Sequence, residues 1–88
     1  MSVRIDLHAF LNFGAPSSVE VEGETVQNCL ETMTKRLPQM QKILFDQEGK
    51  LHGYVEILVN GTSIYPYALA YRVRDGDVIT ALAVLGGG

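Results

Sequence analysis

The last apolar stretch of the chain, Val78 to Leu85, constrains most strongly how this sequence can fold. Apart from Thr80, it is apolar on both faces of an extended strand. Such a strand either lies at the centre of a packed sheet or reserves one face for a partner, and local sequence leaves both interpretations open. A run of three glycines, 86–88, follows it directly.

Two segments near the start alternate between apolar and polar residues, which is typical of half-buried strands. The first is Val3 to Ala9 and the second is Ser18 to Glu22, with turn residues between them. Because the two segments are close in sequence, we expect them to pair as an antiparallel hairpin.

One amphipathic helix follows the hairpin. Thr25 is a good N-cap, because its hydroxyl accepts from the free N–H groups of a first turn, and Pro38 limits continuation at the other end. Met40 to Phe45 is expected to form a short helical turn. The lone cysteine lies within the apolar stripe, so we interpret it as a core residue rather than a nucleophile. The stripe, at helical spacing, comprises Val26, Cys29, Leu30, Met33 and Leu37.

The second half of the chain is predicted to consist mainly of strands and turns. Tyr54 to Val59 is rich in β-branched residues, and Asn60-Gly61 is a strong hairpin signal because both positions accept positive φ. A short return strand is predicted from Ser63 to Tyr67, and a turn at Arg74 to Asp77.

This order predicts an α+β fold in which a mixed sheet of four to five strands packs on one main helix. We expect the first and last strands to lie side by side and parallel at the centre. That is the β-grasp, or ubiquitin-like, architecture. Residues 1–85 are expected to form the β-grasp domain and residues 86–88 a flexible tail.

Composition excludes several function classes. The 88 residues carry a net charge of −3, so we expect no basic face for nucleic acid or anionic lipid. A single cysteine rules out an internal disulfide, and His8 and His52 lack companions at metal-ligand spacing. We also see no membrane span and no signal peptide, so the cytoplasm is the expected location.

Taken together, the motifs of the chain resemble the MoaD/ThiS-type sulfur-carrier family of ubiquitin-like proteins. The resemblance is closest to the molybdopterin synthase small subunit, because the thiamin-type carrier is typically shorter. Two departures are a missing proline before the glycines and an additional glycine, Gly86. The matching stretches are Val3 to Phe10, Thr25-Val26 with Leu30, Leu37-Pro38, Val59-Asn60-Gly61, Arg74 to Asp77, and the apolar strand that runs into the glycines.

The resemblance implies a reaction at Gly88. A carboxylate is a poor electrophile, so a ThiF/MoeB-like partner would use ATP to adenylate it, and a sulfur donor would then give a C-terminal thiocarboxylate. As the small subunit of a synthase with a larger, MoaE-like subunit, the chain would donate that sulfur to a precursor in molybdopterin (molybdenum/tungsten cofactor) biosynthesis. The chain itself would be a non-catalytic carrier without catalytic residues, bound cofactor or metal.

The tail and one sheet face are the candidate contact sites. Gly86 and Gly87 lack side chains, so the tail could enter a narrow channel. Leu58, Leu82 and Val84 are expected to form an outward apolar patch for partners. The alternative is that both sheet faces are covered internally.

Other functions stay open from sequence alone. The chain could serve a thiamin-type or other sulfur carrier pathway, or be a ubiquitin-like protein modifier conjugated through Gly88. A β-grasp binding module with an inert tail is a third interpretation.

Overall fold

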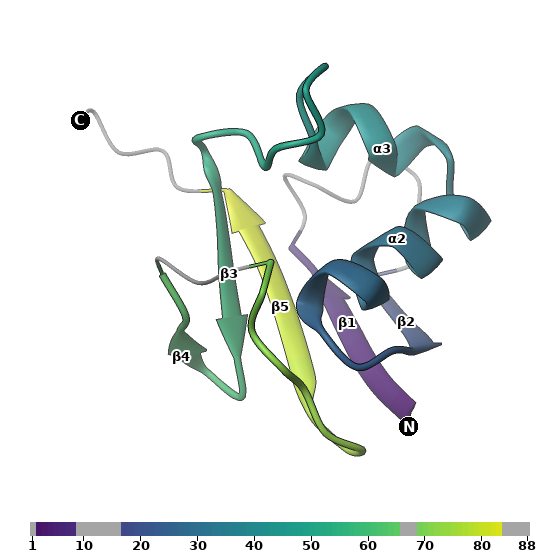
Figure 1. The fold of residues 1–88 in the computed structure, drawn as a ribbon, viewed down its shortest axis with the longest axis vertical. Coiled ribbons are helices and arrows are strands. Elements are labelled where there is room, and N and C mark those ends of the chain that lie inside the picture. Colours follow the sequence, from purple (N-terminus) through teal and green to yellow (C-terminus); the bar gives the residue numbers. More distant parts are fainter. Residues whose placement is uncertain (1, 9–16, 66–68, 84–88) are drawn as a thin grey trace.

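The computed structural model describes residues 2–8, 17–65 and 69–83. Its strands are β1 (Ser2–Leu7), β2 (Ser18–Glu22), β3 (Val55–Val59), β4 (Thr62–Ser63) and β5 (Val78–Ala83), and its helices are α2 (Val26–Arg36) and α3 (Gln39–Leu44). The strands form one sheet, and the helices lie on one side of it (Figure 1). Neither described helix is long and apolar enough to cross a membrane.

The sheet has five strands in the order β2-β1-β5-β3-β4. β1 and β5 are parallel neighbours, with Arg4 opposite Val78 and Leu7 opposite Ala81. All other neighbours are antiparallel. The predicted β-grasp arrangement, with the first and last strands adjacent and parallel near the centre, is therefore confirmed.

The return strand is shorter than predicted. The sequence suggested Ser63 to Tyr67, whereas β4 covers Thr62 and Ser63 only, and Tyr65 lies in a turn. The next residue in sequence is Pro66, which has no N–H group to donate to a strand ladder. The ends predicted at Ala9 and Leu85 lie outside the described residues, and within them β1 ends at Leu7 and β5 at Ala83.

Helix α2 begins as its capping residue predicts. The hydroxyl of Thr25 accepts a hydrogen bond of 3.1 Å from the backbone N–H of Asn28. The N–H groups of Val26 and Gln27 donate to the carbonyls of Tyr71 and Leu69, at 2.9 and 3.1 Å. Residues far along the chain therefore satisfy the free donors of this helix end and fix the segment before β5 to it.

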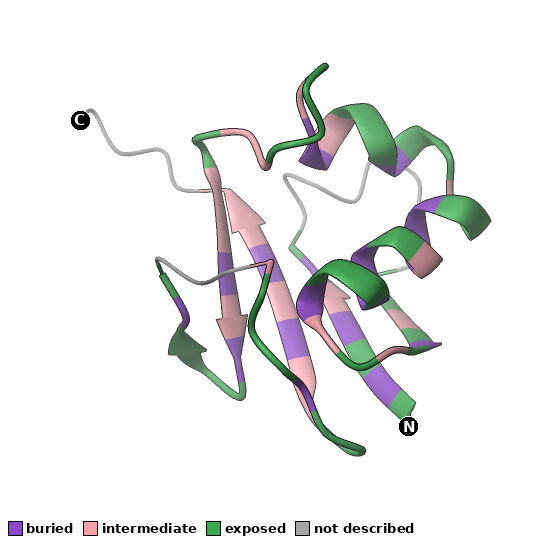
Figure 2. Cartoon of the chain, viewed as in Figure 1, coloured by how far each residue is buried: buried purple, intermediate pink, exposed green. Residues whose placement is uncertain are grey.

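The core lies between the helices and one face of the sheet (Figure 2). Val3, Ile5 and Ile79 from the central strands are fully buried against it. Cys29 is also fully buried, which confirms its interpretation as a core residue, and this burial raises the pKa of its thiol. The buried core residues of the two helices are Val26, Cys29, Leu30, Met33, Met40 and Leu44.

Candidate partner-binding face

The sheet face opposite the helices, here called the open face, is the candidate contact surface. On β5 the residues alternate, so that Ile79 and Ala81 are buried in the core while Val78, Thr80 and Leu82 are only half-buried. The neighbouring strands follow the same alternation in register. The open face comprises Arg4, Asp6, Glu56, Leu58, Val78, Thr80 and Leu82.

Two of the three residues predicted for the partner patch lie together on this face. Leu58 is opposite Thr80, and Leu82 is opposite Glu56 on the same pair of strands, so the two leucines are diagonal neighbours. Both are half-buried, and neither belongs to the helix-covered core. Val84, the third residue, lies outside the described residues, as do Gly86, Gly87 and Gly88.

Local sequence could not decide which residues of β3 are buried. Ile57 and Val59 are 3% and 5% exposed and face the helices, whereas Leu58 between them faces away. Within the described part of the chain, no helix covers Leu58 or Leu82. This geometry favours the interpretation in which the open face is available to a partner.

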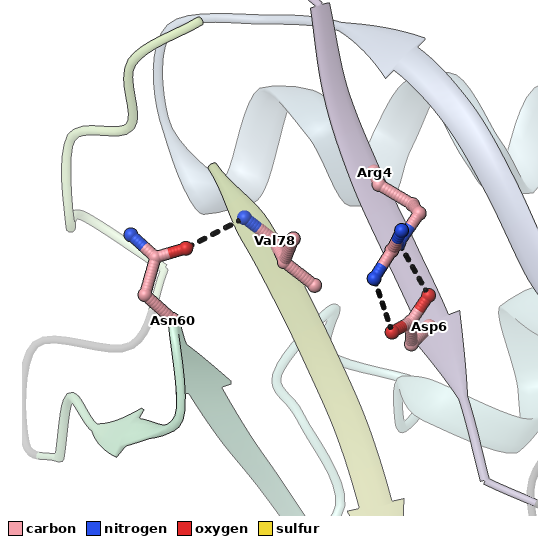
Figure 3. A network of polar contacts seen from close by, with 4 residues as sticks. All are labelled: Arg4, Asp6, Asn60 and Val78. Atoms are coloured by element: carbon pink, nitrogen blue, oxygen red, sulfur yellow. Dashed lines mark hydrogen bonds and ion pairs between the residues drawn. The ribbon is translucent and has the colours of Figure 1, made fainter. Parts of the chain in front are cut away.

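The charges around the apolar residues are mostly paired within the chain. Arg4 Nε and Asp6 Oδ1 are 3.0 Å apart, and the two side chains lie side by side along β1 (Figure 3). The Ser63 hydroxyl donates a hydrogen bond of 2.6 Å to the carboxylate of Glu56. The apolar centre of the open face is thus bordered by polar groups that are already oriented.

Two sequence motifs that looked like separate turns meet in one hydrogen-bonded unit, here called the Asn60–Asp77 junction. Asn60 has a φ of 51° and Gly61 a φ of 84°, as the predicted two-residue hairpin turn requires. The Asn60 side-chain amide donates to Asp77 Oδ1 at 3.0 Å. The Asn60 Oδ1 atom accepts from the N–H of Val78 at 2.9 Å (Figure 3).

The junction also holds the start of β1. Asp77 Oδ2 accepts from the N–H of Arg74 at 2.8 Å, which closes the turn before β5. The N–H of Ser2 donates to Asp75 Oδ1 at 2.7 Å, and Gly76 donates back to the Ser2 carbonyl at 2.8 Å. The start of β5 is therefore fixed from two sides. The pairing of Ala83 with Val55 marks the other end, from which the tail continues.

The junction sets a pH dependence of stability. The hydrogen bond from Asn60, and next the backbone N–H of Arg74, lower the pKa of Asp77 below its ordinary value. Because the folded-state pKa is lowered, the stabilisation is present above about pH 4, the ordinary range of an aspartate, and is lost as the pH falls through the lower folded value.

We expect Asn60→Ala to lower the free energy of unfolding by about 2–3 kcal/mol, because alanine disfavours the left-handed conformation and removes the hydrogen bonds to Asp77 Oδ1 and to the Val78 N–H. Asn60→Gly retains the conformation and should lose only about 1–2 kcal/mol. Urea unfolding at neutral and acidic pH measures both. This account would be contradicted if Asn60→Ala were as stable as the wild type. It would also be contradicted if the loss of stability in Asn60→Gly were as large at acidic pH as at neutral pH.

Among the described residues, no three histidine, cysteine or acidic side chains are grouped so that they could hold a metal ion. His8 is exposed beyond the end of β1. His52 stacks on Tyr54 with ring centroids 4.9 Å apart, and its Nε2 lies 2.9 Å from the Lys42 carbonyl, so it is engaged at the end of α3.

No protein-family model matches the chain, and no curated protein sequence matches it. Solved structures do. The small archaeal modifier protein SAMP1 from Haloferax volcanii is 25% identical, with a TM-score of 0.86 over 100% of both chains. The BexX/CysO complex of Amycolatopsis orientalis contains a chain that is 29% identical, with a TM-score of 0.82 over 98% of this chain and 99% of that one.

A third structure shares the fold at lower identity. The complex of subunits 1 and 2 of the molybdopterin-converting factor from Helicobacter pylori 26695 contains a chain with 20% identity and a TM-score of 0.61, covering 100% of both chains. These neighbours confirm the predicted ubiquitin-like β-grasp fold, and the likeness to SAMP1 and CysO is consistent with the sulfur-carrier resemblance drawn from the motifs.

Proposed function

We propose that the chain is a sulfur carrier in which Gly88 is the C-terminal residue and its carboxylate is converted to a thiocarboxylate. The observation that carries the proposal is the position of the glycines in the sequence, which begin three residues after the end of β5. The sequence runs into the glycines from β5, a strand inside the sheet of a β-grasp body that matches SAMP1 over 100% of its length. Glycines directly after such a strand suit a reactive end that must enter another protein.

The chemistry requires activation by a partner. An ATP-dependent, ThiF/MoeB-like enzyme joins the carboxylate oxygen to the phosphorus of AMP and releases pyrophosphate. A sulfur nucleophile then attacks the carbonyl carbon, AMP leaves, and the thiocarboxylate remains on Gly88. The chain contributes the acyl group and the recognition surfaces, while ATP and the sulfur donor belong to its partners.

Partner recognition would use the open face together with the tail. Leu58 and Leu82 offer an apolar centre, Val84 would extend it toward the tail, and Gly86 and Gly87 would pass through a narrow channel. Partner proteins are present in two of the similar structures, the BexX/CysO complex and the two-subunit complex from H. pylori.

We further propose that the sulfur serves molybdopterin biosynthesis in the cytoplasm, where the chain and a larger, MoaE-like subunit form a synthase and the sulfur is donated to a molybdopterin precursor. The motif resemblance and the H. pylori molybdopterin-converting factor support this assignment. A second candidate function is protein modification through Gly88, which the likeness to a small archaeal modifier protein favours. Both functions begin with the same acyl-adenylate.

Mass spectrometry of the intact chain tests the proposal. The purified chain is incubated with ATP, the adenylating enzyme of the same organism and a sulfide donor. We expect the exchange of one oxygen for sulfur, located in the peptide that ends at Gly88 and absent when ATP is omitted. Adenylation without sulfur uptake, together with isopeptide-linked target proteins, would instead establish the modifier function.

A further inference from the structure

The open face carries two carboxylates, and only one of them is neutralised within the chain. Asp6 is paired with Arg4, whose Nε atom lies 3.0 Å from Asp6 Oδ1. Glu56 on β3 forms no ion pair with any of the described residues, and its one hydrogen-bond partner there is a neutral hydroxyl. Its negative charge is therefore balanced only by solvent as long as this face is uncovered.

The carboxylate of Glu56 is nevertheless held in place. The hydroxyl of Ser63 on β4 donates a hydrogen bond of 2.6 Å to Glu56 Oε1. Ser63 is the register partner of Leu58, so this bond runs diagonally between the two strands. Within the described part of the chain, no donor is bound to the second oxygen, Oε2. One oxygen is thus anchored, and the other is available as an acceptor.

Glu56 lies among the apolar residues of the open face. Its register partner is Leu82 on β5, and Leu58 follows it two residues later on the same face of β3. All three side chains are half-buried. Directly opposed side chains on antiparallel strands have their Cβ atoms about 4.5–5.5 Å apart. A partner that covers Leu82 must therefore cover the carboxylate of Glu56 as well.

Docking over this carboxylate constrains the charge of the partner. Removing a charged group from water costs free energy unless an opposite charge replaces the lost hydration. The Ser63 hydroxyl satisfies one oxygen but carries no charge. A purely apolar partner surface would bury an unbalanced charge, whereas a lysine or arginine beside the apolar contact would balance it. The net charge of −3 on the chain acts in the same direction, because it attracts a basic surface.

We propose that Glu56 is a specificity-determining residue of the open face. It selects a partner whose apolar contact surface carries a lysine or arginine placed to meet Glu56 Oε2, and Ser63 is the positioning residue that orients the carboxylate. This inference rests on the proposed function, in which the open face docks on the adenylating enzyme. It adds the chemistry that this enzyme must present at the contact.

Binding of Glu56→Gln to the adenylating enzyme of the same organism tests the inference. Glutamine keeps the length of the side chain and an oxygen that can accept from Ser63, but it removes the charge. In about 50 mM salt, titration calorimetry should give a dissociation constant at least about tenfold higher than that of the wild type. The difference should shrink in about 0.5 M salt, because salt screens the lost attraction between charges.

Glu48→Gln is the matched control. Glu48 is exposed in the turn between α3 and β3, outside the open face, and its replacement removes the same formal charge. This variant should bind like the wild type, which separates the position of the charge from the net charge of the chain.

Ser63→Ala tests the positioning role. It should bind about threefold more weakly than the wild type, and it should cause no further loss in the Glu56→Gln background, because Ser63 acts through the carboxylate. Full affinity of Ser63→Ala in the wild-type background would overturn this role.

Two results would overturn the role of Glu56. One is a Glu56→Gln variant that binds as tightly as the wild type or more tightly, since the carboxylate would then contribute nothing to recognition. The other is an equal loss in Glu48→Gln, which net charge alone would explain. If the wild type still takes up sulfur in either case, the proposed function stands without this inference. A wild type that neither binds the enzyme nor takes up sulfur would contradict both.

Discussion

Replacing Gly87 by alanine should leave the fold intact and slow thiocarboxylate formation by about 100-fold or more. The fold is insensitive because β5 ends at Ala83, before the substituted position. The reaction should be sensitive because the proposed channel of the adenylating partner accommodates only residues without side chains. A methyl group at position 87 would therefore displace Gly88 in that channel. A small displacement of a reacting carbonyl is enough to lose most of the rate.

Single-turnover charging, followed by mass spectrometry, measures this effect, and urea unfolding verifies that stability is unchanged. Gly86→Ala is the matched control, because it adds the same methyl group one residue farther from the carboxylate and should lose less activity. Charging of Gly87→Ala at the wild-type rate would show that the tail does not enter a narrow site, and the proposed mechanism would be wrong.

Replacing Leu82 by arginine should weaken binding to the adenylating partner by about 30-fold or more, the effect of losing a central apolar contact worth about 2 kcal/mol. Leu82 lies on the open face of β5, the middle strand of the sheet, and is directly opposite Glu56. The new arginine can therefore pair with a carboxylate on the neighbouring strand, which helps to preserve the fold.

Titration calorimetry with the adenylating enzyme gives the dissociation constant. Gln41→Arg is the control, since it adds the same side chain at an exposed position of α3, on the helical side of the sheet. We expect the control to bind like the wild type. If the two variants bind equally well, the open face is not the partner surface and the contact must lie elsewhere.

Much of the fold could be predicted because its signals are local. The alternation of Val3, Ile5 and Leu7 indicates a strand with one buried face, and these residues are indeed buried. The capping hydroxyl of Thr25 and the stripe through Leu30 indicate the main helix equally well. In each case neighbours in sequence specify the same structure that the packed domain stabilises.

The candidate site was less predictable because it depends on residues distant in sequence. Asn60-Gly61 and the turn at Asp77 are common motifs, and nothing local indicates that they share hydrogen bonds. The extent of β4 is a second example. The sequence predicts a return strand from Ser63 to Tyr67, whereas β4 covers Thr62 and Ser63.

The sequence by itself determined the element order, the apolar stripe of the helix, the turn at Asn60 and the glycines that follow the last strand. Only the tertiary structure decided which face of that strand is open. Apart from Thr80, Val78 to Ala83 is apolar on both sides, so the strand's own sequence does not specify which side is buried. Because α2 and α3 pack on one face, Ile79 and Ala81 are buried, and Leu82 and Leu58 lie on the open face.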